Sequence, residues 1–140
     1  MKRLRKAVER YVEAELYDYP YLTKAIEELR ADIAEAGTVT IQTVLGTPIQ
    51  QGRRADPTQA KGIELATNRR LARMHQTVQA IEAVLGRLRP EVRRLIEMKY
   101  FEREYTDQAI ARRIPTSTAT FYRWQIQVVR DIAIELGLAT

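Results

Sequence analysis

The side chains best equipped for chemistry in this 140-residue sequence lie close together near its C-terminal end. Residues 117–123 carry four hydroxyl groups and one guanidinium group, and Arg112 and Arg113 stand just before them. Hydroxyl and guanidinium groups donate hydrogen bonds to carbonyl, ring-nitrogen and phosphate acceptors. The set therefore favours recognition of a polar or anionic partner over the making and breaking of bonds.

Catalytic chemistry has little support elsewhere in the chain. There is no cysteine, and the single histidine, His75, falls inside a predicted helix without an acidic partner at ligand spacing. A phosphate-binding GxxxxGK loop is also missing. The acids around Glu28 and Asp32 favour a solvated helix face over a metal site. We therefore expect a protein that is not an enzyme and has no catalytic residues, metal or cofactor.

The net charge of +5 is unevenly distributed. Residues 58–100 contain nine Lys and Arg but only four Asp and Glu. This excess suits contacts with phosphates, although a solvated basic helix face explains it equally well. Charges recur too often for a signal peptide or a membrane span, so we expect a cytoplasmic protein with no membrane partner.

The elements that position these residues are predicted to be helical, and the fold class is all-α. Apolar residues at helical spacing predict a helix over 2–17 and a second helix from Pro20 to about residue 36. The Tyr-Asp-Tyr-Pro sequence at 17–20 predicts a break between them, so that 1–36 forms a helical hairpin. Gly37 and the alternating, β-branched residues after it predict a linker or extended arm over 37–57.

A long third helix is predicted from Pro57 to about Leu88, with Asp56 as a possible N-cap. Its apolar residues alternate at spacings of three and four, as in a heptad seam. The seam is either the buried face of a helix in a single core or the interface of a homodimer. Pro90 predicts the start of a fourth helix that packs on two sides. The seam residues are Leu71, Met74, Val78, Ile81, Leu85 and Leu88.

Residues 106–124 divide into a short helix, a tight turn and a longer helix. Thr106 and Ser117 are suitable N-caps for the two helices. Phe121 and Trp124 would anchor the second helix in the core, and Ala111 would allow a close crossing. This arrangement predicts a helix-turn-helix within a domain covering 58–140, although a plain helical hairpin has a similar pattern.

In a helix-turn-helix the second helix enters the major groove of DNA, and its first turns face the bases. Arg123 would bridge guanine O6 and N7 or hold a phosphate, and Ala119 would touch a thymine methyl group. The hydroxyl groups would contact phosphates or bases, and two arginines at the end of the first helix would lie near a DNA backbone. The candidate DNA-binding residues are Ser117, Thr118, Ala119, Thr120, Tyr122, Arg123, Arg112 and Arg113.

These residues belong to a wider resemblance. The stretch 106–124, with its Thr-Phe-Tyr-Arg-Trp sequence at 120–124, is similar to the end of the RinA-like phage late-gene transcriptional activators, which are related to the ArpU regulators. The sequences at 15–20, 56–58, 69–71 and 98–101 resemble other segments of that family, so the resemblance covers most of the chain. It implies a fold like region 4 of bacterial sigma factors and activation of late phage genes with bacterial RNA polymerase as a partner.

Two other functions remain open from the sequence. Small terminase subunits of phages also join a helix-turn-helix to helical oligomerisation segments, and the seam would then build a ring. A helical adaptor that binds another protein through residues 1–36 is the third possibility. Within the activator hypothesis, the acidic face that includes Glu28 and Asp32 would meet a basic polymerase surface.

Overall fold

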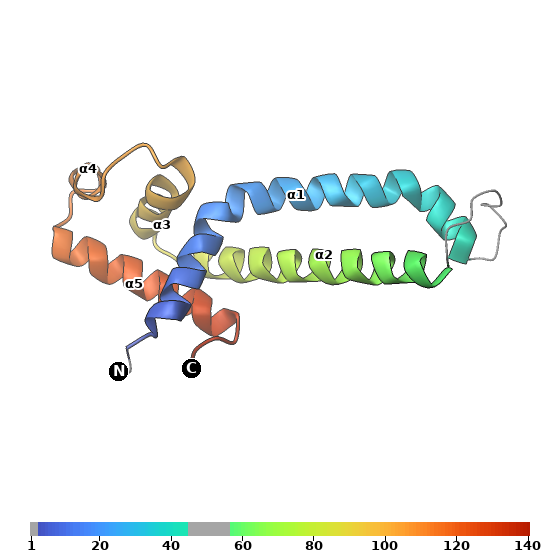
Figure 1. The fold of residues 1–140 in the computed structure, drawn as a ribbon. Coiled ribbons are helices and arrows are strands. Elements are labelled where there is room, and N and C mark those ends of the chain that lie inside the picture. Colours follow the sequence, from blue (N-terminus) through green and yellow to red (C-terminus); the bar gives the residue numbers. More distant parts are fainter. Residues whose placement is uncertain (1–2, 45–56) are drawn as a thin grey trace. The chain divides into compact units, whose positions relative to one another are not determined.

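The computed structural model describes residues 3–44 and 57–140, with the backbone alone over 33–44 and 57–67. All regular structure in these residues is helical, which confirms the predicted all-α class. The chain divides into two compact units, Met1–Tyr21 with Gln76–Thr140 and Leu22–His75. The elements are α1 (Lys6–Val44), α2 (Pro57–Leu85), α3 (Pro90–Ile96), η2 (Glu97–Glu102), α4 (Asp107–Arg113) and α5 (Thr118–Glu135) (Figure 1).

The predicted break at residues 17–20 is wrong, because α1 continues through Pro20. Residues 1–36 therefore form no helical hairpin of their own. A proline inside a helix costs about 3 kcal/mol or more, since it removes a hydrogen bond and its ring crowds the preceding turn. Packing of the turn just before Pro20 opposes this cost: Leu16 is fully buried, and the Tyr19 ring stacks on Phe101 with centroids 4.9 Å apart.

The predicted arm over 37–57 is also wrong for its first part, because 37–44 belong to α1. The helix propensities of β-branched residues lie within about 0.7 kcal/mol of alanine, so alternation alone does not exclude a helix. The remainder of the predicted arm, including the Asp56 N-cap, lies outside the described residues.

The second unit pairs the later part of α1 with the earlier part of α2 (Figure 1). The two segments are linked by a contact of 3.2 Å between Nη2 of Arg30 and Nε2 of His75. Both long helices contribute residues to each compact unit, and for this reason the units do not follow the predicted boundaries at 36 and 58.

The third helix begins at Pro57, as predicted, and ends at Leu85. Three of its seam residues, Val78, Ile81 and Leu85, are buried within the chain. Ile81 and Leu85 belong to the same core as Val12 and Leu16 of α1. At these positions the seam is the buried face of a helix in a single core, which was one of the two predicted interpretations.

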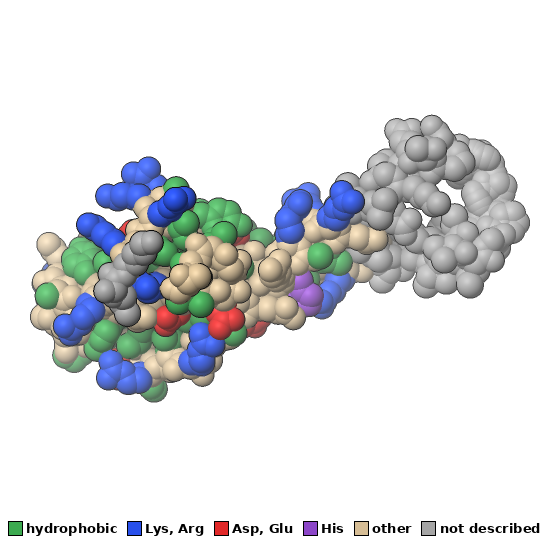
Figure 2. Space-filling model, turned by 90° about the horizontal axis from the view of Figure 1, so that it is seen from below, with side chains coloured by type: hydrophobic (Ala, Val, Ile, Leu, Met, Phe, Trp, Pro, Cys, Tyr) green, Lys and Arg blue, Asp and Glu red, His purple; other side chains and the backbone are tan. Residues whose placement is uncertain are grey.

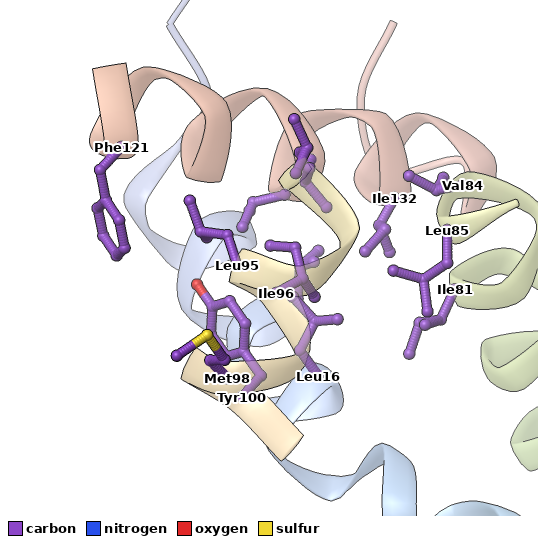
Figure 3. Close-up of a cluster of buried hydrophobic side chains, with 14 of the residues drawn as sticks. Leu16, Ile81, Val84, Leu85, Leu95, Ile96, Met98, Tyr100, Phe121 and Ile132 are labelled. Atoms are coloured by element: carbon purple, nitrogen blue, oxygen red, sulfur yellow. The ribbon is translucent and has the colours of Figure 1, made fainter. Parts of the chain in front are cut away.

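The fourth helix begins at Pro90 and continues from α3 into the π-helical turn η2, which ends at Arg103 in a left-handed conformation with φ of 57°. Its buried residues confirm the prediction that it packs on more than one side. Figure 3 shows Leu95, Ile96 and Tyr100 beside Leu16 of α1, with Phe121 reaching in from α5. Burial of this apolar surface stabilises the first unit by roughly 25 cal/mol per Å² removed from water.

Candidate nucleic-acid interface

The candidate interface begins with the short helix α4, which Thr106 caps as predicted. The Thr106 side chain accepts a hydrogen bond of 3.2 Å from the amide of Ala109. Asp107 follows at the first helical position, where a carboxylate interacts favourably with the helix dipole. Ile110 and Ala111 are buried, at 0% and 4% exposure. Two apolar residues therefore anchor α4 in the core, and its opposite face is exposed to solvent.

A tight turn joins α4 to α5. The amide of Thr116 donates to the carbonyl of Ala111 over 3.0 Å, which satisfies a carbonyl at the end of α4. Ser117 then caps α5, as predicted, because its hydroxyl accepts a hydrogen bond of 3.1 Å from the amide of Thr120. These two hydrogen bonds fix the end of α4 and the start of α5, and so they define the conformation of the turn between the helices.

The first turns of α5 separate apolar from polar side chains as the sequence predicted. Phe121 is fully buried and Trp124 packs partly buried against the same core. Arg123 is exposed on another face of the helix. The Arg89 guanidinium group lies over the Trp124 ring, 5.1 Å from the ring centroid, a contact that the sequence did not indicate.

The exposed face of α5 holds most of the predicted DNA-binding residues together. Ser117, Thr118 and Ala119 are exposed in the first turn, and Tyr122 and Arg123 are exposed in the next. Tyr122 leaves 44% of its surface in solvent, whereas Thr120 is half-buried. The face therefore combines hydroxyl donors, one guanidinium group and the methyl side chain of Ala119 within two helical turns.

Hydrogen bonds within this face orient its charged group. The Ser117 hydroxyl donates to Oγ1 of Thr120 over 3.0 Å. Nη2 of Arg123 donates to the same oxygen over 3.3 Å. Thr120 thus connects the helix cap to the guanidinium group, and its half-buried position explains how it supports Arg123 from beneath. A supported guanidinium group loses less conformational freedom when it binds.

Tyr122 and Lys99 converge on Asp107. Nζ of Lys99 lies 2.8 Å from Oδ1 of Asp107, and the Tyr122 hydroxyl donates to Oδ2 over 3.4 Å. The Lys99 side chain is only 13% exposed, and Nζ lies 5.9 Å from the Phe121 ring centroid. Asp107 of α4 therefore contacts side chains from both η2 and α5. Its hydrogen bond holds the Tyr122 hydroxyl near the start of α4. No spacing in the sequence singled out Lys99 or Asp107.

Arg112 and Arg113 are exposed at the end of α4, where the sequence placed them. The guanidinium carbon of Arg113 lies 4.3 Å from the Tyr105 ring centroid. Such cation–π contacts leave the polar edge of the guanidinium free to donate hydrogen bonds. The two arginines extend the positive charge of the interface from α5 to α4.

A buried polar network behind the interface was not predicted. The Tyr100 hydroxyl donates to Oε2 of Glu13 over 2.8 Å, and Nε2 of Gln125 donates to the Tyr100 oxygen over 2.9 Å. Burial, followed by the negative charge of Glu13, raises the pKa of Tyr100 well above the usual value for tyrosine. The phenol therefore stays protonated and ties α1 and η2 to α5. Only the burial pattern of the folded chain brings these three residues together.

Among the side chains of 3–32 and 68–140, no His, Cys, Asp or Glu residues gather into a group that could hold a metal ion. None of the helices in these ranges has an apolar stretch long enough to cross a bilayer. Comparisons of the chain with protein-family models, curated proteins and solved structures give no match.

Proposed function

We propose that this protein binds duplex DNA in a sequence-specific manner through α4 and α5, which act as a helix-turn-helix with α5 as the recognition helix. One observation carries the proposal. The first two turns of α5 place Ser117, Thr118, Ala119, Tyr122 and Arg123 in solvent while Phe121 is fully buried beneath them. A recognition helix needs this division between a core face and a face of donors and small residues.

The chemistry of the exposed face matches base edges and phosphates. The Arg123 guanidinium fits the O6 and N7 acceptors of guanine, and the Ala119 methyl group fits the methyl group of thymine. Ser117 and Thr118 open the helix, where hydroxyls and backbone amides commonly bind phosphate. Arg112 and Arg113 would contact the DNA backbone next to α4. Tyr122 would exchange its hydrogen bond to Asp107 for one to the DNA.

The biological role that fits best is transcriptional regulation, with activation of phage late genes in the cytoplasm of a bacterial host. This role is supported by the similarity of residues 106–124 to the RinA-like activators, together with the segments at 15–20 and 98–101. In this proposal the fold of α4 and α5 corresponds to region 4 of sigma factors, and bacterial RNA polymerase is a partner. Light scattering separates this role from DNA packaging, because a ring of many subunits would favour a small terminase subunit.

A binding experiment tests the proposal. Duplexes retained by the protein are first selected from a random pool, and the affinities of variants for the selected duplex are then measured by fluorescence anisotropy. Arg123→Ala should weaken binding by about 1–3 kcal/mol and relax the preference at one base pair. Arg87→Ala is a matched control, because it removes one exposed arginine that is paired with Glu135 on the surface.

The two variants give distinct outcomes. If Arg123 reads a base, only Arg123→Ala changes the preferred sequence, and Arg87→Ala leaves it unchanged. Equal affinity and equal preference for wild type and Arg123→Ala would mean that α5 is not the recognition helix. Absence of any enriched sequence in the selected pool would reject sequence-specific binding altogether.

A further inference from the structure

Three arginines on α2 form a second basic surface, which we call the arginine stripe. It consists of Arg69, Arg70 and Arg73, all of them exposed. With about 3.6 residues per helical turn, the three side chains leave α2 within an arc of roughly 100°. Figure 2 shows blue Lys and Arg side chains around the single histidine, His75, which follows the stripe on the same helix.

The charge of the arginine stripe is not balanced along its own helix. Residues 65–81 contain no Asp or Glu. Arg69 and Arg73 stand four residues apart, the spacing at which like charges on a helix repel each other. The stripe therefore weakens the helix that carries it, and an anionic partner would relieve the repulsion.

Among the described side chains, those of the neighbouring helix in the second unit form no ion pair with the stripe either. The exposed acids Glu27, Glu28 and Asp32 lie on α1. Yet within the described side chains none of the ion pairs joins an acid of α1 to an arginine of α2. The contact that does link the two helices places the Arg30 guanidinium beside His75, which brings another positive group to α2.

We propose that the arginine stripe binds the phosphate backbone of duplex DNA without sequence preference. This inference rests on the proposed function and adds a second contact surface to it. Guanidinium groups form paired hydrogen bonds with phosphate oxygens, and the exposed amide of Asn68 lies beside them in the sequence. A regular polyanion suits three like charges on one helical face, because each neutralised phosphate releases counterions.

The two surfaces would have different tasks. The exposed face of α5 discriminates between sequences, whereas the arginine stripe raises affinity for every sequence equally. Contacts with phosphate alone carry no base information, so loss of the stripe should leave the ratio of specific to nonspecific affinity unchanged.

The test measures affinity against salt between about 50 and 200 mM for the selected duplex and for a shuffled duplex. The triple variant Arg69→Gln, Arg70→Gln, Arg73→Gln should lower the slope of log affinity against log salt by about 2–3. Affinity should fall by the same factor for both duplexes. Each single variant should lower the slope by about 1, and these variants decide the question if the triple variant is not helical by circular dichroism.

Two control variants separate the stripe from a general charge effect. Arg69→Lys, Arg70→Lys, Arg73→Lys keeps the charge and should retain most of the slope. Arg3→Gln, Arg5→Gln, Arg10→Gln removes the same charge from exposed positions near the N-terminus. An unchanged slope in the glutamine variants of the stripe would overturn the inference, as would an equal loss of slope in the N-terminal variant. An unchanged DNA slope together with lost binding to an acidic protein would reassign the stripe to that partner.

The experiments also distinguish failure of the stripe inference from failure of the proposed function. If the stripe variants lose slope while Arg123→Ala keeps both affinity and preference, the stripe binds DNA and α5 does not read it. If Arg123→Ala loses preference while the stripe variants behave as wild type, α5 reads DNA and the stripe inference is wrong.

Discussion

Tyr100 contacts residues of two other helices, α1 and α5, that lie far from it in the sequence. Its ring lies edge-on to Tyr17 with centroids 4.9 Å apart, and its hydroxyl contacts Glu13 and Gln125. A charged carboxylate close to a core is tolerated only when donors surround it. Tyr100 and Gln125 are those donors for Glu13, since both contact its Oε2 atom. The polar network therefore places α5 against α1, and through α5 it positions the candidate interface.

Removal of one hydroxyl tests this network. Tyr100→Phe should lower the free energy of unfolding by about 1–3 kcal/mol, because Glu13 and Gln125 lose a partner that buried polar groups need. Urea denaturation measures the change. The matched control is Tyr11→Phe, since Tyr11 is 50% exposed and its loss of a hydroxyl should change stability by less than about 0.5 kcal/mol. Equal stabilities for the two variants would show that the network contributes nothing.

At the scale of elements, α1 shows that tertiary packing can outweigh the tendency of a proline to end a helix. Pro20 stands inside α1, and the boundary along the chain between the two compact units follows Tyr21 in the same helix. The buried residue Ile26 lies six positions beyond the proline, and Leu16 lies four positions before it. The apolar surface buried on both sides favours continuation of the helix. Pro90 behaves differently, because it occupies the first turn of α3, where its missing amide costs nothing.

Exchange of each proline for alanine compares the two positions. Pro20→Ala should stabilise the protein by roughly 2 kcal/mol or more, because alanine restores the helical hydrogen bond at a smaller cost from a freer unfolded chain. Pro90→Ala should leave stability unchanged or lower it by about 0.4–1 kcal/mol. Thermal unfolding followed by circular dichroism measures both. A destabilised Pro20→Ala variant would show that the proline ring itself supports α1.

On the scale of the whole molecule, one core joins the first and last parts of the chain. Val12 and Leu16 come from α1, Ile81 from α2, and Val128 and Ile132 from α5, all within a single cluster. Much of the predicted heptad seam is used inside this cluster, so its last two turns are not free for a second chain. The same cluster supports Phe121 beneath the exposed face of α5.

This use of the seam predicts that folding does not depend on association. The midpoint of urea unfolding should stay constant when the protein concentration is varied about 100-fold, because mass action shifts only an associating system. Ile81→Ala should lower the free energy of unfolding by about 2–5 kcal/mol without changing the molecular mass in solution. A midpoint that rises with concentration would instead support the homodimer.

The sequence alone determined the features that depend on neighbours along the chain. The caps Thr106 and Ser117, the start of α2 at Pro57 and the start of α3 at Pro90 all follow from local hydrogen bonding and from the chemistry of proline. The inward side of α5 followed from helical spacing. These local rules were sufficient to place most of the candidate recognition residues of α5 on one exposed face, although Thr120 is half-buried.

Only the tertiary structure decided the features that depend on distant residues. Continuation of α1 through Pro20 depends on contacts such as that between Tyr19 and Phe101, which lie far apart in the sequence. The convergence of Lys99 and Tyr122 on Asp107 likewise requires η2, α4 and α5 to meet. The physical reason is that pairing between distant residues contributes as much free energy as local propensity, yet residue spacing does not show which distant residues will pair.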